Sequence, residues 1–220
     1  MEQRKIQAVL FDMDGLMFDT EKIYMDAWKR TGELLNIPIG DEFLIPSRGM
    51  IRADSRQLFE QLYHPDMSYE EIINVRQQFV EKEFEKGVEC KTGLKELLIY
   101  LKKERYAIAL ATSTPRERAI KLLQQTKTEE YFDALVCGDM VQKGKPEPDI
   151  FLRAAKEVKK EPVHCLVLED SKNGIMAGKR AGCKVIMIPD LIPATKDIEE
   201  MVDARFDTLF QVIPWLQEES

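Results

Sequence analysis

Short hydrophobic runs alternate with amphipathic segments along most of the chain. The runs are four to six residues long, end at polar or turn-forming residues, and cover 6–11, 106–111, 134–137, 163–168 and 184–188. Such runs are typical of strands buried on both faces of a parallel sheet. The segments between them, including 94–101 and 150–158, repeat apolar residues every three or four positions, as a helix face does. The alternation predicts βαβ units, and hence an α/β fold with a doubly wound parallel sheet.

One long stretch departs from this alternation. Residues 19–88 show no convincing strand but several helical periodicities, one of them opened by Ser68 and Glu71 at the spacing of a helix capping box. Without this stretch about 150 residues remain, the size of one ordinary domain. We therefore expect an α/β core domain formed by residues 1–18 and 89–220, with residues 19–88 inserted after the first strand as a helical cap domain.

Composition and charge exclude several classes of protein. Hydrophobic residues make up 44% of the chain, enough for an ordinary core. The net charge is −7, whereas a general nucleic-acid-binding protein needs clustered lysine and arginine, so we expect no nucleic-acid partner. No apolar run has the length of a membrane span or of a signal-peptide core, so we expect no membrane association. The four cysteines form no CxxC pair, which favours a reduced, cytoplasmic location, and the lack of a heptad pattern favours a monomer.

Polar residues gather where the predicted strands end. In a parallel α/β sheet the carboxyl ends of the strands meet at one edge, and ligands bind there. The residues at these positions are Asp12, Asp14, Thr112, Ser113, Glu169 and Asp170, with Lys145 in the loop after the third run. Carboxylates that are brought together raise one another's pKa unless a cation lies among them, and oxygen ligands favour a hard cation. The sequence therefore predicts a Mg²⁺ site at this edge.

A site for an anion is expected next to the metal. Thr112 and Ser113 precede a helix-start pattern with Thr114 as the expected N-cap and Pro115 at the first helical position. Backbone N–H groups at a helix start, a hydroxyl and the ammonium group of Lys145 would together suit a phosphoryl group. A carboxylate beside the metal could then attack phosphorus and form an aspartyl-phosphate.

Four motifs carry a resemblance to a known family. They are FDMDGLMFDTE at 11–21, ALATST at 109–114, KGKPEPDIF at 143–151 and VLEDSKNGI at 167–175. In this order and at these separations, the chain resembles the haloacid dehalogenase-like superfamily, and within it the phosphatases and β-phosphoglucomutases with a helical cap after the first strand. The resemblance covers nearly the whole chain and implies a Rossmann-like core. One departure is Leu16, which stands where the first motif of the family often has threonine.

The resemblance implies a role for each strand-end residue. Asp12 would be the nucleophile and Asp14 the general acid and base. The implied metal site comprises Asp12, Asp14, Glu169 and Asp170, and the implied phosphoryl contacts are Thr112, Ser113 and Lys145, of which Thr112 and Lys145 are also catalytic. In the cap, Arg52 lies in a segment that resembles the loop approaching the substrate in this family. Arg48 and Arg76 are the other cap arginines considered as contacts of a phosphorylated substrate, and the alternative for all three is a solvated helix surface.

These observations predict a Mg²⁺-dependent phosphomonoester hydrolase that acts on a small phosphorylated metabolite of the sugar phosphate type through an aspartyl-phosphate. A β-phosphoglucomutase-type mutase remains the alternative, because both enzymes use the same core residues. In the mutase a cap histidine assists proton transfer, and Tyr24 stands at the corresponding position here. A phospho-accepting receiver module lacks an inserted cap, so the length argues against it. His64 and His164 follow no strand, so we expect neither a histidine-based triad nor a zinc site.

Overall fold

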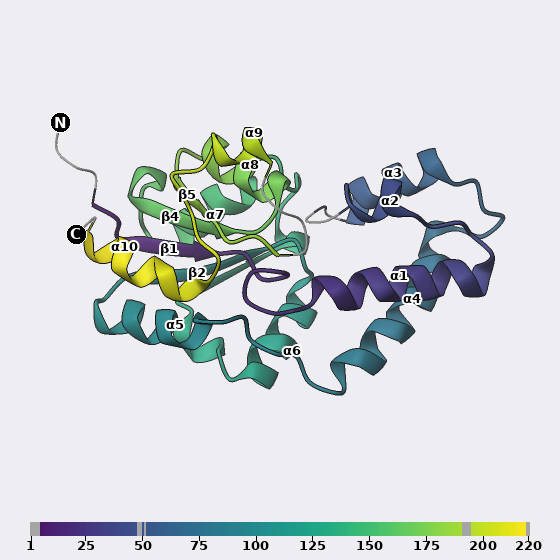
Figure 1. The fold of residues 1–220 in the computed structure, drawn as a ribbon, viewed down its shortest axis with the longest axis horizontal. Helices are drawn as coiled ribbons and strands as arrows, with labels where there is room; N and C mark the ends of the chain where they lie inside the picture. The colour runs from purple at the N-terminus through teal and green to yellow at the C-terminus, as the bar shows by residue number, and fades with distance from the viewer. Residues whose placement is uncertain (1–4, 48–49, 51, 191–194, 219–220) are drawn as a thin grey trace.

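The computed structural model describes residues 5–47, 50, 52–190 and 195–218. Its centre is a sheet of six parallel strands in the order β3-β2-β1-β4-β5-β6 (Figure 1). The strands are β1 (Ala8–Phe11), β2 (Ala107–Thr112), β3 (Ala134–Cys137), β4 (Cys165–Glu169), β5 (Lys184–Met187) and β6 (Ala204–Arg205). In the register of the sheet, Leu10 of β1 lies between Ala109 of β2 and Val167 of β4. The first strand of the chain is therefore a central strand of the sheet.

Helices cover both faces of the sheet (Figure 1). They are α5 (Leu94–Lys103), α6 (Arg116–Thr126), α7 (Asp149–Glu157), α8 (Lys172–Arg180), α9 (Lys196–Glu199) and α10 (Val212–Glu218). Val9 and Phe11 pack into one hydrophobic core with α5, α6 and α10, whereas Ala8 and Leu10 pack into a second core with α7 and α8. Alternate side chains of a strand point to opposite faces, so a strand between two cores must be apolar throughout. This burial explains the continuous apolar runs and confirms the predicted doubly wound sheet.

The predicted strands differ from the observed ones at their ends. β4 begins at Cys165 rather than at residue 163, because Pro162–His164 form a short 3₁₀ turn. β2 extends one residue further than expected, to Thr112. β6 was not predicted, because its two residues are too few to show an apolar period.

The connection from β1 to α5 folds into helices α1 (Glu21–Leu35), α2 (Asp41–Leu44), α3 (Arg52–Leu62) and α4 (Tyr69–Phe84), which we call the helical lobe. Figure 1 shows this lobe beyond the carboxyl ends of the strands. α4 begins with the predicted capping box: the N–H of Glu71 donates to Ser68 Oγ at 3.3 Å, and the N–H of Ser68 donates to Glu71 Oε2 at 2.9 Å. None of the helices that the structure describes has the length and hydrophobicity to span a membrane.

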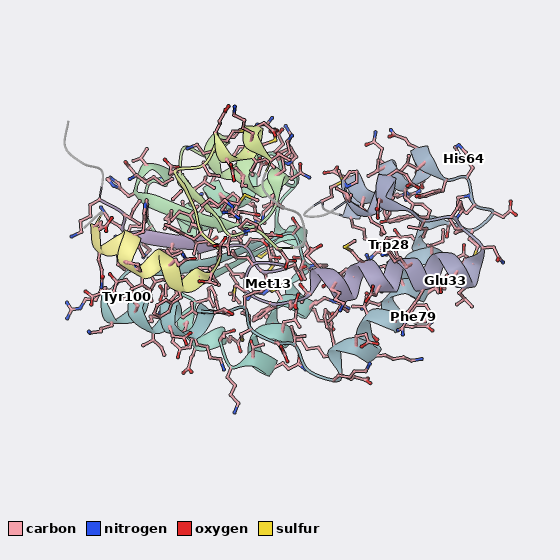
Figure 2. All side chains as sticks on the ribbon, in the orientation of Figure 1. Met13, Trp28, Glu33, His64, Phe79 and Tyr100 are labelled. Atoms are coloured by element: carbon pink, nitrogen blue, oxygen red, sulfur yellow. The ribbon has the colours of Figure 1, made fainter. Side chains whose placement is uncertain are left out.

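The helical lobe has a hydrophobic core of its own. Trp28, shown in Figure 2, packs edge-on against Phe43 with 4.9 Å between ring centroids and stacks on Phe59 at 5.6 Å. Edge-to-face and offset-stacked pairs of this kind add to the stability gained from burial. These rings belong to a buried cluster that is separate from the two clusters beside the sheet. The lobe therefore has the interior expected of a cap, and the domain boundaries at residues 19 and 88 stay a prediction.

Candidate active site

The carboxyl edge of the sheet brings the predicted strand-end residues together. Asp12 directly follows β1, Thr112 ends β2 and Glu169 ends β4. Because β1 lies between β2 and β4, Asp12 has a neighbour from each strand. Asp170 follows Glu169, and Lys145 reaches the same place from the loop before α7. All five side chains are buried, which is unusual for charged groups unless they are paired.

Lys145 forms a buried ion pair with two carboxylates. Its Nζ donates to Oδ1 of Asp12 and, at 2.6 Å, to Oε1 of Glu169, and only 1% of the lysine side chain is exposed. Burial alone would lower the pKa of Lys145, but the charges of Asp12 and Glu169 outweigh it and raise the pKa above the ordinary lysine value. The lysine therefore stays charged and supplies a fixed positive charge beside Asp12.

Three carboxylates form a cluster that fits a divalent cation. Asp12, Glu169 and Asp170 each offer one oxygen, and these oxygens lie within 4.8 Å of one another. Burial raises the pKa of Asp12, the charge of Glu169 adds to this effect, and Lys145 counteracts it. An oxygen-only donor set suits a hard cation such as Mg²⁺, which would also relieve the repulsion among the carboxylates.

Glu169 is held more firmly than its neighbours. Its Oε2 accepts hydrogen bonds from the N–H groups of Asp170 and Ser171, both at 2.9 Å, and from Ser171 Oγ at 3.0 Å. Its other oxygen accepts from Lys145. Both oxygens are thus engaged within the protein, which suits the predicted role of orienting the metal site.

Two glycines allow the acidic cluster to form. Gly15 has φ +83°, and a Cβ there would lie 2.5 Å from Oδ2 of Asp170. A Cβ at Gly174, in the first turn of α8, would collide with the carboxylate of Glu169. At both positions the backbone therefore lies so close to a carboxylate that any residue with a Cβ would collide with it.

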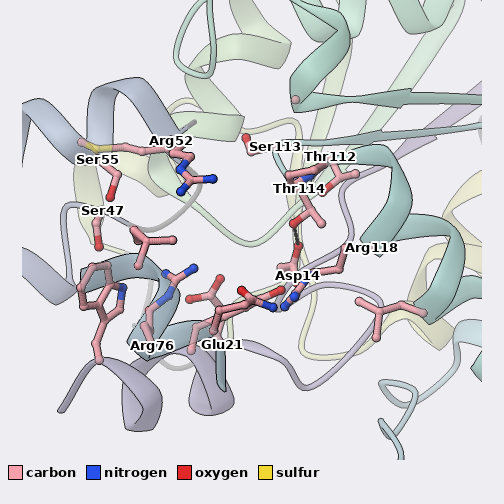
Figure 3. Close-up of a pocket in the computed structure, with 18 of the residues that line it drawn as sticks. Asp14, Glu21, Ser47, Arg52, Ser55, Arg76, Thr112, Ser113, Thr114 and Arg118 are labelled. Carbon is pink, nitrogen blue, oxygen red and sulfur yellow. Dashed lines mark hydrogen bonds between the residues drawn. The ribbon is translucent and has the colours of Figure 1, made fainter. Parts of the chain in front are cut away.

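Asp14 is held by two hydroxyl groups. Thr20 Oγ1 donates to its Oδ1 at 2.7 Å. Thr114 Oγ1 donates to its Oδ2 at 2.6 Å (Figure 3). The prediction that Thr114 caps a helix is wrong: Pro115 is the N-cap residue of α6, and the N–H of Arg116 donates instead to Oδ1 of Asp139 at 3.2 Å. The hydroxyl of Thr114 is directed at the carboxylate of Asp14, to which it donates, and not at the start of α6.

A pocket of about 740 Å³ separates the strand ends from the helical lobe. The strand side contributes Asp12, Asp14, Thr112, Ser113 and Thr114, and the lobe contributes Tyr24, Trp28, Arg52, Ser55 and Arg76 (Figure 3). Lys145 and Glu169 lie behind Asp12 and do not line the pocket. A ligand in this pocket would therefore meet Asp12 and Asp14 directly.

The cap arginines singled out from the sequence differ in their surroundings. Arg52 lines the pocket, is exposed, and is paired with Glu70. Arg76 also lines the pocket and lies above the rings of Trp28 and Tyr24. Arg48 lies outside the described residues.

Thr20 was not predicted to take part in the site, whereas Tyr24, which stands at the position of the mutase's histidine, lines the pocket. Thr20 precedes α1 and has the sequence signal of an ordinary N-cap, so nothing in the pattern points to its bond with Asp14. Burial and the charge of Asp14 raise the pKa of Tyr24, so its phenol stays protonated at neutral pH. The two histidines do not line the pocket: His64 lies at the far end of the lobe (Figure 2), and His164 precedes β4.

Comparison with known proteins agrees with this geometry. Residues 9–188 match the model of the haloacid dehalogenase-like hydrolase family. The chain therefore belongs to this family of hydrolases, as the four motifs implied.

Named relatives include both phosphatases and mutases. The chain is 33% identical over 181 residues to the phosphorylated carbohydrates phosphatase of Thermotoga maritima, covering 82% of this chain and 84% of the relative. It is 30% identical over 184 residues to the β-phosphoglucomutase of Bacillus subtilis, covering 80% of each. The crystal structure of CbbY from Rhodobacter sphaeroides in complex with phosphate superimposes with a TM-score of 0.81 at 25% identity, covering 94% of this chain and 96% of that one. The protein is thus a phosphatase of this family that acts on phosphorylated substrates.

Proposed function

We propose that this protein is a Mg²⁺-dependent phosphomonoester hydrolase that acts on a small phosphorylated metabolite of the sugar phosphate type through an aspartyl-phosphate. One observation carries the proposal: buried Asp12, paired with Lys145 and next to Asp170, faces a pocket in which Asp14 is fixed by two hydroxyls. This arrangement provides a nucleophile, a charge-stabilising cation and a proton carrier at one place.

In the first step, a carboxylate oxygen of Asp12 attacks phosphorus. A bond forms between that oxygen and phosphorus while the ester P–O bond breaks, and its electron pair leaves with the alkoxide. Asp14, acting as an acid, gives its proton to the alkoxide, so the alcohol leaves neutral. In this proposal Lys145, which donates to Asp12, and the hydroxyl of Thr112 stabilise the charge on the transferring phosphoryl group.

In the second step, water attacks the phosphorus of the aspartyl-phosphate. Asp14, now a carboxylate, takes a proton from this water as the new P–O bond forms. The bond between phosphorus and Asp12 breaks, which releases inorganic phosphate and restores the carboxylate of Asp12. The hydroxyls of Thr20 and Thr114 keep Asp14 oriented through both transfers.

A divalent cation would be held by Asp12, Asp170 and the backbone carbonyl of Asp14, with Glu169 orienting the site. When bound, Mg²⁺ lowers the repulsion between the anionic phosphoryl group and the carboxylates. The carboxylate cluster fits this cation because all its donors are oxygens and the pKa of Asp12 is raised by burial when no cation is present.

Water is the expected acceptor rather than a second sugar hydroxyl. Tyr24 borders the pocket at the position where the mutase uses a histidine, and its raised pKa prevents it from exchanging a proton near neutral pH. The mutase alternative predicts formation of glucose 6-phosphate from β-glucose 1-phosphate without release of phosphate.

The test is release of inorganic phosphate from p-nitrophenyl phosphate and from a panel of sugar phosphates, with and without Mg²⁺. Asp12→Asn should abolish turnover, because an amide is a poor nucleophile, whereas Asp207→Asn on the surface should leave it unchanged. Turnover by Asp12→Asn at the wild-type rate, or no wild-type activity with any divalent metal, would contradict the proposal.

A further inference from the structure

Arg76 is a half-buried cation of the pocket whose Nε has no hydrogen-bond partner. It lies on α4, lines the pocket, and its Nε is buried with no hydrogen-bond partner. Among the residues that the structure describes, Arg76 forms neither a hydrogen bond nor an ion pair. A buried N–H without a hydrogen-bond acceptor is costly, so we expect the guanidinium to gain an acceptor when a ligand enters the pocket.

Aromatic rings fix the orientation of this guanidinium. Its central carbon lies 4.8 Å from the ring centroid of Trp28 and 5.7 Å from that of Tyr24. A ring attracts the cation to its face but is no conventional hydrogen-bond acceptor for the N–H groups of the guanidinium. The rings thereby hold Arg76 in place without satisfying its hydrogen bonds.

The other arginines of the pocket are already engaged. Arg52 is paired with Glu70, and Arg118 lies 3.8 Å from Glu81 and above the ring of Phe84. Burial lowers the pKa of Arg76, and the positive charges of Arg118 and Arg52 add to this effect. The surroundings of Arg76 therefore favour the binding of an anion.

Arg76 lies across the pocket from the reacting groups. Figure 3 shows its guanidinium on the lobe side, close to Glu21, while Asp14 and Thr112 lie on the strand side. Glu21 lines the same side of the pocket. A substrate whose phosphoryl group meets Asp12 would therefore extend toward Arg76.

We infer that Arg76 binds a second anionic group of the substrate, either a carboxylate or a second phosphoryl group. This inference rests on the proposed phosphatase function and sharpens it: the preferred substrate is a small phosphomonoester with another negative charge at its far end. An arginine presents paired donors that match both kinds of oxyanion. Arg76 is thus a specificity-determining residue rather than a catalytic one.

The experiment compares substrates that differ mainly in the second charge. One pair is glycerol 3-phosphate and 3-phosphoglycerate, which tests a carboxylate. The other is fructose 1-phosphate and fructose 1,6-bisphosphate, which tests a second phosphoryl group. For each pair we measure the ratio of the two kcat/KM values. We also measure both compounds as inhibitors of p-nitrophenyl phosphate hydrolysis, because the ratio of their inhibition constants does not depend on their own turnover.

We expect the wild type to favour the doubly anionic member of at least one pair by about tenfold or more, as charge-assisted hydrogen bonds give. Arg76→Gln should bring that ratio close to one, while Arg76→Lys should keep part of it. The matched control is Arg30→Gln, because Arg30 also lies above an aromatic ring, that of Phe79, but pairs with Glu83 and does not line the pocket. This control should leave both ratios unchanged.

The outcomes separate the two proposals. If the wild type hydrolyses p-nitrophenyl phosphate but shows no preference within either pair, or if the preference survives in Arg76→Gln, the inference about Arg76 is overturned and the phosphatase function stands. If the wild type hydrolyses nothing, the phosphatase function itself fails. Both readouts are ratios measured within one variant, so a partly unfolded preparation of Arg76→Gln does not change them. Arg76→Lys provides a second variant in which the same ratios can be measured.

Discussion

Replacing Lys145 by methionine tests the buried charge arrangement at the strand ends. Methionine has a similar length and keeps the packing against Phe151, whose ring centroid lies 5.0 Å from the lysine Nζ, but it removes the charge between Asp12 and Glu169. Two buried carboxylates then face each other without the cation that separates them. Removing one partner of a buried ion pair leaves an uncompensated buried charge.

The expected loss of stability is large for a single substitution. The side chains of Lys145 and Glu169 are 1% and 0% exposed, and that of Asp12 is 10% exposed, so solvent screens the interaction little. Breaking such a pair costs about 3–5 kcal/mol, which corresponds to a fall in Tm of about 10 °C for a chain of this size. Lys102→Met removes an exposed pair with Asp133 and should cost less than about 1 kcal/mol.

The loss should also depend on pH. Burial raises the pKa of Asp12 above 3.8, and removal of Lys145 takes away the charge that opposes this rise. A carboxyl whose pKa is raised by folding binds its proton more tightly in the native state. Its contribution to stability is therefore present below the unfolded pKa and lost as pH rises through the folded pKa. The variant should consequently be less destabilised at about pH 5 than at about pH 8.

Urea denaturation of wild type, Lys145→Met and Lys102→Met at both pH values, without Mg²⁺, measures these differences as free energies of unfolding. Added Mg²⁺ should recover part of the lost stability, because the cation can compensate the same carboxylates. If Lys145→Met costs no more than Lys102→Met, or if its deficit grows as pH falls, the reasoning about the buried pair is refuted.

Three further substitutions test other parts of the structure. Gly15→Ala should abolish phosphatase activity and weaken Mg²⁺ binding, because its Cβ would lie 2.5 Å from Oδ2 of Asp170; isothermal titration measures the affinity. Thr114→Val should lower kcat about tenfold with little change in KM, because Asp14 loses one of the hydroxyls that orient it. Ser68→Ala should lower stability by about 1 kcal/mol in thermal unfolding without changing kcat, because it removes the cap of α4.

Each of these predictions has a matched control or a contrary result. Gly182→Ala has the same φ of +83° but open space around it, so it should share the backbone strain and keep full Mg²⁺ affinity. Thr195→Val removes an exposed hydroxyl far from Asp14 and should keep kcat. Equal Mg²⁺ affinities of the two alanine variants, a wild-type kcat in Thr114→Val, or unchanged stability in Ser68→Ala would each contradict the corresponding argument.

The strands and the polar edge of the sheet could be predicted because both depend on local pattern. A strand between two hydrophobic cores must be apolar at every position, and its end is marked by the first charged residue, such as Asp12 after β1. Parallel strands then place such ends at one edge whatever the details of packing. The topology alone therefore predicts that Asp12, Thr112 and Glu169 lie close to one another.

Side-chain partners could not be predicted in the same way. Thr114 has the sequence signal of an N-cap, and its choice of Asp14 depends on a residue 100 positions away. Arg52 and Arg76 have the same side chain, and in the structure both lie on helices of the lobe, α3 and α4. One is paired with Glu70 and the other lies unpaired on Trp28, because neighbouring helices decide what each meets.

The aromatic core of the helical lobe also makes the lobe optically distinct. Of the two tryptophans in the chain, Trp28 is buried among the lobe's rings, whereas Trp215 lies on α10 beside the sheet and contacts Lys184. Replacing Trp215 by phenylalanine leaves an emission that comes from the lobe alone. The same ring of Trp28 borders the pocket and supports Arg76, so this intrinsic fluorescence reports both on the folding of the lobe and on what occupies the space above it.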